Sequence, residues 1–499
     1  MKKKFGRVIK YLLVFIPLCA LGQKPNVVFI YVDDLGYGDL GCYGSKTIKT
    51  PNIDQLAKKG LIFTQAHTTS ATCTPSRYSL LKGEYAFRRK DTGVATGDAV
   101  ALIPGGQQTV ATIFSKAGYN TAVIGKWHLG LGPLGGPNWN GKIADGPLDI
   151  GFKEAFIMPA TGDRVPCVYV ENDHVRNLAS QDPIQVSYLK KIGNQPTGKE
   201  NPELLKMKHS HGHDNTIVNG VGRIGFMVGG KQALWDDEDM AQTFADKAKS
   251  FMVRNQKNPF FLYFATHDIH VPRIPHSRFL GKSGFGTRGD ALLQLDDSVG
   301  QLMKTLDSLH LTSNTLVILT SDNGPVVDDG YIDGSKENIG LHQPAGNLRG
   351  GKYSSFEAGT RVPFIVRWPK KVPVGKSNAL ISQIDFLATM SQLLGTSFNE
   401  NSAKDSRANL STWVGKNKLG REYIVEQAGS LAIKKGDWKF IRSGKAAKFN
   451  PLVNIELGND LEDQLYNLKT DPEEKINLAL QQKEKLNELK TLLEIELNK

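Results

Sequence analysis

The sequence has little cysteine and no long apolar run. Only four of the 499 residues are cysteine, at positions 19, 42, 73 and 167, which excludes a small scaffold held together by disulfides. A bridge between Cys42 and Cys167 is conceivable in an oxidising compartment, but no sequence pattern indicates it. The apolar run from Tyr11 to Leu21 is too short to cross a bilayer as a helix, and we therefore expect no stable membrane insertion.

The chain also lacks the features of a nucleic-acid-binding protein. Its formal net charge is +12, yet the basic residues form no concentrated stripe with interleaved aromatics, and no reading-helix motif is present. We therefore expect no nucleic-acid partner, whereas the modest positive excess favours acidic substrates such as sulfated polymers. With 40% hydrophobic and 22% charged residues and no internal repeat, the chain is expected to form one large domain with a smaller appendage.

Residues 1–22 have the pattern of a secretory signal peptide. Basic residues precede the apolar run, and Ala20-Leu21-Gly22 after it is a plausible small-residue cleavage site. Losing the five basic residues of this segment would lower the formal net charge from +12 to about +7. Cys19 could indicate lipidation, but Leu18 is larger than the small residue that a lipobox has before its cysteine. We expect an exported, periplasmic protein, with an extracellular or lipid-anchored one as the alternatives.

Short β-branched runs alternate with helical patterns, which is typical of an α/β fold with a parallel sheet. Strands are predicted at residues 26–32, 121–124, 260–265, 315–320 and 364–366. Helices are predicted from Pro51, with Thr50 as N-cap, and at residues 107–119, 236–257, 290–309 and 384–394. Residues 131–235 show no clear periodicity, which favours a long functional insertion. We predict a large domain at 23–395 and a C-terminal α+β subdomain at 396–499, with short antiparallel strands and a last helix at 481–497.

Two strands of the predicted sheet end in neighbouring acidic or amide residues. Asp33 and Asp34 follow the first strand, and Asp322 and Asn323 follow the strand at 315–320. A turn or cap built from Asp explains either pair alone. Since the carboxyl ends of parallel strands form the usual ligand-binding edge of such a sheet, two such pairs favour a metal site with hard oxygen ligands.

The segment Cys73-Thr74-Pro75-Ser76-Arg77 resembles the signature of type I sulfatases. Taken alone, it is also compatible with a buried or redox cysteine beside a turn-forming Pro-Ser. Five further segments resemble motifs of the same family and follow in the family's order: the Asp33 and Asp322 pairs, residues 125–130, residues 266–272, and residues 350–363. The resemblance extends over residues 25–480. It departs at Glu84, where the family has an arginine.

The resemblance implies an alkaline phosphatase-like fold, a large mixed, mostly parallel sheet flanked by helices. It also implies that a formylglycine-generating enzyme oxidises Cys73 to formylglycine (3-oxoalanine) before the chain folds. The hydrated aldehyde would attack the sulfur of a sulfate ester and then release sulfate by re-forming its carbonyl. Together with residue 73, the implied ligands of one calcium ion, or less favoured magnesium, are Asp33, Asp34, Asp322 and Asn323.

The resemblance also assigns roles to the basic residues of these motifs. Arg77 and Lys126 would hold and polarise the nucleophile, and His128 would take the proton that drives sulfate release. Lys352 would bind the sulfate, and His270, with Lys352 as a possible helper, would give a proton to the leaving alcohol. For a polar substrate, the candidate binding residues are His267, Asp163, Arg164, His211 and His213.

The expected substrate is a sulfated carbohydrate, attacked at a terminal sulfate. By analogy with arylsulfatase A and galactosamine-6-sulfatase-like enzymes, a 6-O-sulfated galactose or N-acetylgalactosamine is the first candidate. A formylglycine-dependent phosphonate or phosphate ester hydrolase and a non-catalytic glycan-binding protein are the alternatives. A zinc site at His209, His211 and His213 is a further, less favoured alternative to a substrate-lining loop.

Overall fold

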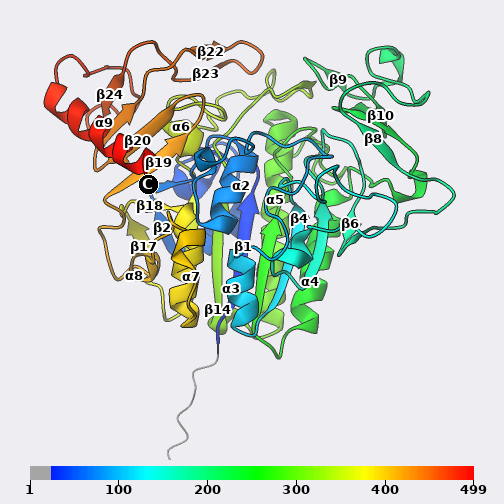
Figure 1. Ribbon diagram of the computed structural model, residues 1–499, viewed down its shortest axis with the longest axis horizontal. Helices are drawn as coiled ribbons and strands as arrows, with labels where there is room; N and C mark the ends of the chain where they lie inside the picture. Colours follow the sequence, from blue (N-terminus) through cyan, green and yellow to red (C-terminus); the bar gives the residue numbers. More distant parts are fainter. Residues whose placement is uncertain (1–23) are drawn as a thin grey trace, which may run out of the picture.

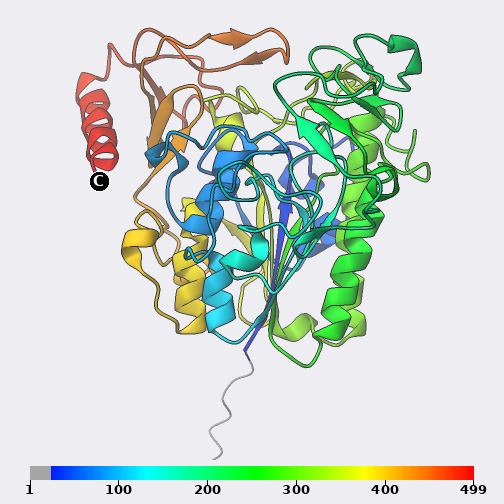
Figure 2. The same cartoon turned by 45° about the vertical axis from the view of Figure 1, so that its right-hand side comes forward.

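A central mixed sheet carries helices on both faces in the computed structural model, which describes residues 24–499 (Figures 1 and 2). The predicted signal peptide, 1–22, and Cys19 lie outside the described residues. The ten strands, in spatial order, are β17 (Gly375–Ser377), β2 (Leu61–Phe63), β16 (Phe364–Arg367), β14 (Thr315–Ser321), β1 (Asn26–Val32), β13 (Phe260–Ala265), β4 (Asn120–Lys126), β5 (Glu154–Met158), β6 (Val170–Glu171) and β7 (His174–Val175). The predicted α/β class with a large, mostly parallel sheet is confirmed.

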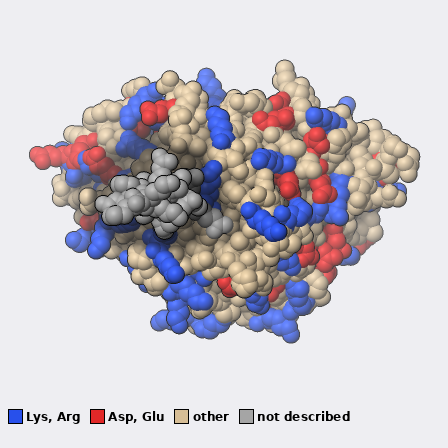
Figure 3. Space-filling view, turned by 90° about the horizontal axis from the view of Figure 1, so that it is seen from below, with Lys and Arg blue, Asp and Glu red and all other residues tan. Residues whose placement is uncertain are grey.

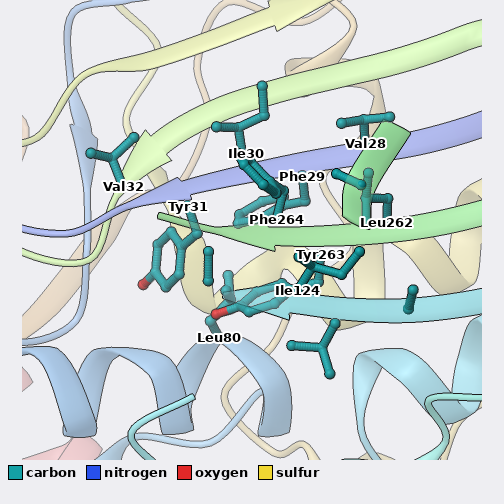
Figure 4. Packing of buried hydrophobic residues seen from close by; sticks show 14 of the residues in the cluster. Val28, Phe29, Ile30, Tyr31, Val32, Leu80, Ile124, Leu262, Tyr263 and Phe264 are labelled. Atoms are coloured by element: carbon teal, nitrogen blue, oxygen red, sulfur yellow. The ribbon is translucent and has the colours of Figure 1, made fainter. Parts of the chain in front are cut away.

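The middle of the sheet is apolar on both faces. β1 pairs in parallel with β13 and β14, and all seven of its residues are buried. Phe29 of β1 packs on Phe386 with ring centroids 4.4 Å apart, and on Tyr263 of β13 at 6.0 Å. Figure 4 shows these strands with side chains above and below the sheet. A strand covered by helices on both sides needs such a continuous apolar run, which is why the sequence predicts the central strands well.

Three strands of the main sheet, β5, β6 and β7, lie in the region predicted to be irregular, and β5 is the longest of them. β5 pairs in parallel with β4, and four of its five residues are buried. Its apolar part is only four residues long and has no alternation, which is too short for sequence periodicity to identify. After β5 the insertion is mostly irregular, and its strands are only two or three residues long. Besides β6 and β7 they include the pairs of β8 (Gln185–Ser187) with β12 (Phe226–Val228) and of β10 (Ile217–Val218) with β11 (Val221–Gly222).

The helices form two layers. α2, α3 and α7 pack together on one face of the sheet, and α1, α4 and α5 on the other (Figures 1 and 2). The bounds are α1 (Pro51–Lys58), α2 (Cys73–Lys82), α3 (Val110–Lys116), α4 (Met240–Arg254), α5 (Gly286–Ser308), α6 (Glu357–Thr360), α7 (Phe386–Leu394), α8 (Leu410–Trp413) and α9 (Lys483–Leu497). The predicted helices are all present, with ends shifted by a few residues.

The start of α1 differs from the prediction in one respect. Thr50 precedes the helix, but its buried hydroxyl caps nothing and has no hydrogen-bond partner among residues 24–499. The carboxylate of Asp296 on α5 accepts instead from the backbone N–H groups of Asn52 at 3.1 Å and Ile53 at 2.8 Å. A carboxylate from a neighbouring helix satisfies the free N–H groups of α1, which a local sequence pattern cannot show.

The underside of the molecule is rich in Lys and Arg side chains (Figure 3). α1, α3 and α4 end with Lys58, Lys116 and Arg254 in their last turns, where a cation complements the helix dipole. Among the described residues, no helix has both the length and the apolar character needed to cross a membrane. Cys42, Cys73 and Cys167 are all free thiols, so the structure contains no Cys42–Cys167 bridge.

The C-terminal part of the chain forms a second, antiparallel sheet. Its strands are β19 (Tyr423–Gln427), β20 (Leu431–Lys435), β21 (Trp438–Ile441) and β24 (Gln464–Asn467), and α9 packs against β20 and β21. In Figure 1 this sheet lies at the upper left and the insertion at the upper right of the main sheet. The α+β character predicted for this region is confirmed, whereas the boundary at 395/396 stays a prediction.

A buried ionic cluster joins the two sheets. Lys434 of β20 and Lys439 of β21 lie 2.8 and 3.2 Å from the carboxylate of Glu357 on α6. Glu426 of β19 accepts from His67 of β3 (Ala66–His67) at 2.7 Å. His67 precedes Cys73 by six residues and Glu357 follows Lys352 by five. The cluster therefore fixes the C-terminal sheet to both segments that lead to the site described below.

Glu474 in this cluster predicts a pH dependence of stability. Its buried carboxyl accepts from the backbone N–H of Glu357 at 2.7 Å. Burial first, with Lys439 opposing it and the charge of Glu357 adding to it, raises the pKa of Glu474 to about 7. The unfolded chain releases this proton near pH 4.5 and the folded chain near pH 7, so the free energy of unfolding falls as pH rises through this window, by up to about 3 kcal/mol.

We expect Glu474→Gln to remove that dependence. Urea unfolding of both proteins at pH 5 and pH 7.5 measures it, and the stability of the wild type relative to the variant should fall on going to pH 7.5. Glu473→Gln is the matched control, because Glu473 is partly exposed and, among residues 24–499, forms an ion pair only with Lys475. The prediction would be contradicted if the difference in free energy of unfolding between the wild type and Glu474→Gln were the same at pH 5 and pH 7.5.

Candidate active site

The carboxyl ends of four parallel strands meet at one edge of the main sheet and carry most of the predicted site. β1 leads into Asp33 and Asp34, β14 into Asp322, β4 ends at Lys126, and β13 leads into the segment with His270. α2 begins at Cys73 beside this edge. Parallel strands end on the same side of a sheet, so residues far apart in the sequence come together there.

Three carboxylates gather at the centre of the edge. An oxygen from each of Asp33, Asp34 and Asp322 lies within 4.8 Å of the others, and all three side chains are fully buried. Asn323 donates from its amide nitrogen to Asp34 at 2.7 Å. Asp34 adopts the left-handed conformation, with φ 60°, which turns its side chain toward this group. Its backbone N–H also lies 3.3 Å from Asp322.

This group fits a hard cation. Within the described chain, Oδ1 of Asp33 and Oδ1 of Asn323 are buried without a hydrogen-bond partner. Burial first and then the charge of Asp33 raise the pKa of Asp322 to about 7. Burial likewise raises the pKa of Asp34, although Lys352 opposes it. The carboxylates therefore lack enough positive charge to ionise together, and a metal ion bound by oxygen ligands would supply it.

Each of the three carboxylates already has a cationic neighbour: Arg77 for Asp322, Lys126 for Asp33 and Lys352 for Asp34. The guanidinium of Arg77 donates through Nε to Asp322 at 2.9 Å, and its Nη2 lies 2.8 Å from the same oxygen. Nζ of Lys126 lies 2.5 Å from Asp33. Burial raises the pKa of Asp33, but Lys126 and then His270 bring it well below its usual value. Both predicted positioning residues thus lie beside the predicted ligands.

Cys73 is the first residue of α2 and is almost completely buried. Burial raises the pKa of its thiol, while Lys126 and Lys352 act in the opposite direction. An unmodified Cys73 therefore stays protonated, and a protonated thiol is a weak nucleophile. Lys126 and Lys352 would instead stabilise a negatively charged oxygen at this position.

The ring of His128 has a defined tautomer. Its Nε2 lies 2.9 Å from the carbonyl oxygen of Ala95, which can only accept, so Nε2 carries the proton. Nδ1 then holds a lone pair and has no partner in the described part of the chain. Burial, followed by Lys126, lowers the pKa of His128 well below its ordinary value, which keeps the ring neutral. A neutral ring with an unpaired Nδ1 is suited to accept a proton.

His270 and His267 follow β13. Nδ1 of His270 donates to the carbonyl of Val271 at 2.7 Å, which leaves Nε2 available. Burial, followed by Lys352, holds the pKa of His270 well below its usual value. His267 lies against the metal group formed by Asp33, Asp34 and Asp322, with its Nδ1 3.7 Å from Asp33. These two rings and Asp33 form a second possible metal group, which shares Asp33 with the three carboxylates.

Lys352 connects the metal group to Asp329, a residue that no recognised sequence motif contains. Its ammonium lies 3.0 Å from Asp34 and 2.9 Å from Asp329, and the hydroxyl of Tyr353 also donates to Asp329 at 3.0 Å. Burial lowers the pKa of Lys352, but Asp329 and Asp34 raise it well above its ordinary value. The only sequence signal for Asp329 is the Asp328-Asp329-Gly330 run shortly after Asn323.

Three of the predicted substrate-binding residues form one group. Arg164 donates to Asp163 at 2.8 Å, and Asp163 accepts from His213 at 3.0 Å. Burial raises the pKa of Asp163, but Arg164 and His213 bring it well below its usual value. His211 contacts this group through its backbone carbonyl, which accepts from Nδ1 of His213 at 2.9 Å, whereas its ring nitrogen contacts the hydroxyl of Ser210. His209 lies in β9 (Lys208–His209), which pairs with β15 (Tyr331–Ile332), so the three histidines have different surroundings.

Comparisons with known proteins identify the family of the chain. The family model described as Sulfatase matches residues 25–396. The chain is 55% identical over 474 residues to N-acetylgalactosamine-6-O-sulfatase of Bacteroides thetaiotaomicron, which covers 95% of this chain and 93% of the relative. It is 31% identical over 480 residues to human arylsulfatase A, covering 92% and 84%.

The structural comparison gives the same result. A solved structure, titled for the metabolism of multiple glycosaminoglycans by Bacteroides thetaiotaomicron, matches with a TM-score of 0.95 and 54% identity. The match covers 96% of this chain and 100% of that chain, so it includes the C-terminal sheet as well as the main sheet. The predicted resemblance is confirmed: the chain belongs to the sulfatase family, and it is a hydrolase of sulfuric esters.

Proposed function

We propose that this sulfatase removes a terminal 6-O-sulfate from a galactose or N-acetylgalactosamine residue, using a formylglycine made from Cys73. The surroundings of residue 73 carry the proposal for the nucleophile. A plain thiol stays protonated there, while Lys126, Lys352 and a cation held by Asp33, Asp34 and Asp322 would stabilise the anion of a hydrated aldehyde. Hydrated formylglycine supplies a hydroxyl that attacks sulfur and a carbonyl that re-forms as sulfate leaves.

The chain's own residues hold the reacting groups and move the protons. Lys352, kept charged by Asp34 and Asp329, binds a sulfate oxygen. His128 takes a proton at Nδ1, which is buried and unpaired within residues 24–499. His270 gives a proton from Nε2 to the leaving alcohol. In the free site its pKa lies low, and the negative charge of an incoming sulfate ester would raise it.

The proposed cation is calcium, held by Asp33, Asp34, Asp322, Asn323 and the oxygen of residue 73. All these ligands are hard oxygen donors, which calcium prefers, and magnesium is the alternative. A bound cation supplies positive charge beside the attacking hydroxyl and the sulfate oxygens. Arg77 and Lys126 orient the two carboxylates nearest the nucleophile.

The substrate class rests on the relatives and on the polar rim of the site. A relative at 55% identity carries the name N-acetylgalactosamine-6-O-sulfatase. Asp163, Arg164 and His213 form a charged, hydrogen-bonded group from the insertion, and such groups can pair with sugar hydroxyls that lose water on binding. We further propose export to the periplasm through residues 1–22 and maturation by a formylglycine-generating enzyme.

A substrate panel tests the proposed function. Purified enzyme is given defined 2-, 3-, 4- and 6-sulfated galactose and N-acetylgalactosamine, a steroid sulfate and an aryl phosphate, and released anion is measured. We expect the 6-sulfated sugars to react fastest. A steroid sulfate that reacts much faster than every sugar would contradict the carbohydrate substrate. Faster reaction of the aryl phosphate would favour the phosphate ester alternative, and a preference for another position would overturn only the linkage.

A further inference from the structure

A groove borders the reaction centre on the side of the C-terminal sheet. It has a volume of about 560 Å³ and is open to solvent. One wall comes from the start of α2 and the loop that follows it, and the other from the turn after β19 and from residues 446–459. Ligand pockets in proteins measure about 300–1,000 Å³, so the groove can hold a sugar residue.

The groove lies next to Cys73 and Lys352. Two of its lining residues stand on either side of Cys73 in the sequence: Thr72 directly before α2, and Pro75 in the first turn of α2. Tyr353, also in the lining, directly follows Lys352. A molecule that places its sulfate over residue 73 therefore has the groove beside it, toward the C-terminal sheet.

Tyr353 is held in an uncommon conformation. Its φ is +74°, which is strained for a bulky side chain, and its hydroxyl donates to Asp329. Its backbone N–H donates to the carbonyl of Ala71 at 2.8 Å. Backbone strain of this kind persists where surrounding contacts fix a side chain at a ligand site. The contacts to Asp329 and Ala71 fix the Tyr353 ring as a wall of the groove.

The charge of the groove has one sign. Arg89 and Lys90 line it, and none of the described lining residues is acidic. Arg89 forms a bidentate pair with Asp91 and donates to the carbonyl of Leu102, so its charge is already partly used. Lys90 is exposed and forms no ion pair within residues 24–499. An anionic group in the groove would therefore meet Lys90 first.

We propose that the groove binds the sugar next to the sulfated one, and that this neighbour carries an anionic group, a carboxylate or a second sulfate. The proposal rests on the proposed function, because it assigns the next sugar of the same substrate. Lys90 attracts the anionic group, and the apolar side chains of Pro75, Val94 and Leu457 face the less polar parts of the ring. The enzyme then prefers an oligosaccharide with alternating neutral and anionic residues to a free sulfated monosaccharide.

The test compares a 6-sulfated monosaccharide with disaccharides in which the sulfated sugar is followed by a uronic acid, by a second sulfated sugar, or by the uronic acid with its carboxyl reduced to an alcohol. We expect a higher kcat/KM for the anionic disaccharides than for the monosaccharide and for the reduced disaccharide. The two anionic disaccharides distinguish a carboxylate from a sulfate as the preferred group.

Two variants locate the binding. Lys90→Gln should lower kcat/KM for the preferred anionic disaccharide about three- to tenfold, the effect of a charge at a solvent-exposed rim, and leave the monosaccharide unchanged. A side chain at Gly93 would enter open space in the lining, so Gly93→Phe should obstruct the groove and slow only disaccharides. Lys116→Gln, at the exposed end of α3, is the charge-matched control.

The proposed binding in the groove would be overturned if Lys90→Gln changed kcat/KM equally for the monosaccharide and the disaccharide, or changed neither. Equal rates of the wild type on the monosaccharide and all three disaccharides would also overturn it. In these cases activity on 6-sulfated sugars still supports the proposed function. Absence of sulfate release from every sugar, with a steroid sulfate hydrolysed, would overturn the proposed function itself.

Discussion

Replacing Cys73 with alanine should abolish sulfate release. Removing the nucleophile of a covalent mechanism lowers kcat on the order of 10⁶-fold, because the remaining groups stabilise a transition state that no longer forms. The variant should keep its fold, since the thiol makes no hydrogen bond to any of residues 24–499 and alanine leaves out only one buried atom. Initial rates of sulfate release, with the thermal midpoint as a control for folding, measure the effect.

Mass spectrometry of the wild-type enzyme separates the proposed nucleophile from a plain thiol. Trypsin cuts after Lys59 and after Arg77, so one peptide, 60–77, carries residue 73. We expect an aldehyde at this position in active enzyme. The formylglycine mechanism would be refuted by fully active enzyme with an unmodified thiol. A chain made without a maturing enzyme should carry cysteine and be inactive with the same fold.

Loss of the cation should have the second largest effect. Asp322→Ala removes a predicted ligand and also the carboxylate that receives Arg77. We expect kcat to fall at least about 10²–10³-fold, the effect of losing one preorganised electrostatic contact, with a further loss from the absent ion. Metal analysis should find about one calcium per chain in the wild type and less in the variant. Chelation followed by calcium should abolish and restore wild-type activity.

Asp246→Ala is the matched control for a lost carboxylate. Asp246 is exposed on α4, and within the described part of the chain its side chain pairs only with Lys249 and Gln242. It should keep both the metal and the activity. Full activity of Asp322→Ala, or active wild-type enzyme without calcium or magnesium, would contradict the metal assignment. Restoration by magnesium alone would change the ion and keep the site.

The central strands could be predicted from the sequence because their environment imposes a local pattern. β1, β13 and β14 lie between two helix layers, so each must be continuously apolar. The same regularity places Asp33 and Asp322 at neighbouring strand ends. β5 has only four apolar residues in sequence, and its identity as a strand depends on pairing with β4, which is a property of the assembled sheet.

The reacting groups were predictable where a motif contains them, and their supporting contacts were not. Cys73, Lys126 and Asp322 stand in short recognisable segments. Asp329 acts through Lys352 and Tyr353, and its place depends on how a loop folds back onto the sheet edge. The same reason explains Asp296, which serves the first turn of α1 from another helix. Contacts between segments that are far apart in the sequence produce no local pattern, so they could not be predicted from the sequence.

The burial of Cys73 has a consequence for the history of each molecule. α2 begins at Cys73, and all ten of its residues are buried, so a folded chain offers a maturing enzyme no extended stretch around this thiol. If Cys73 is modified as proposed, its oxidation must occur before the chain folds. A chain that folds first can no longer be oxidised at Cys73 and stays inactive. The rate per milligram of protein then depends on the fraction of molecules in which residue 73 was oxidised. Rates of variants should therefore be compared per molecule that carries the oxidised residue.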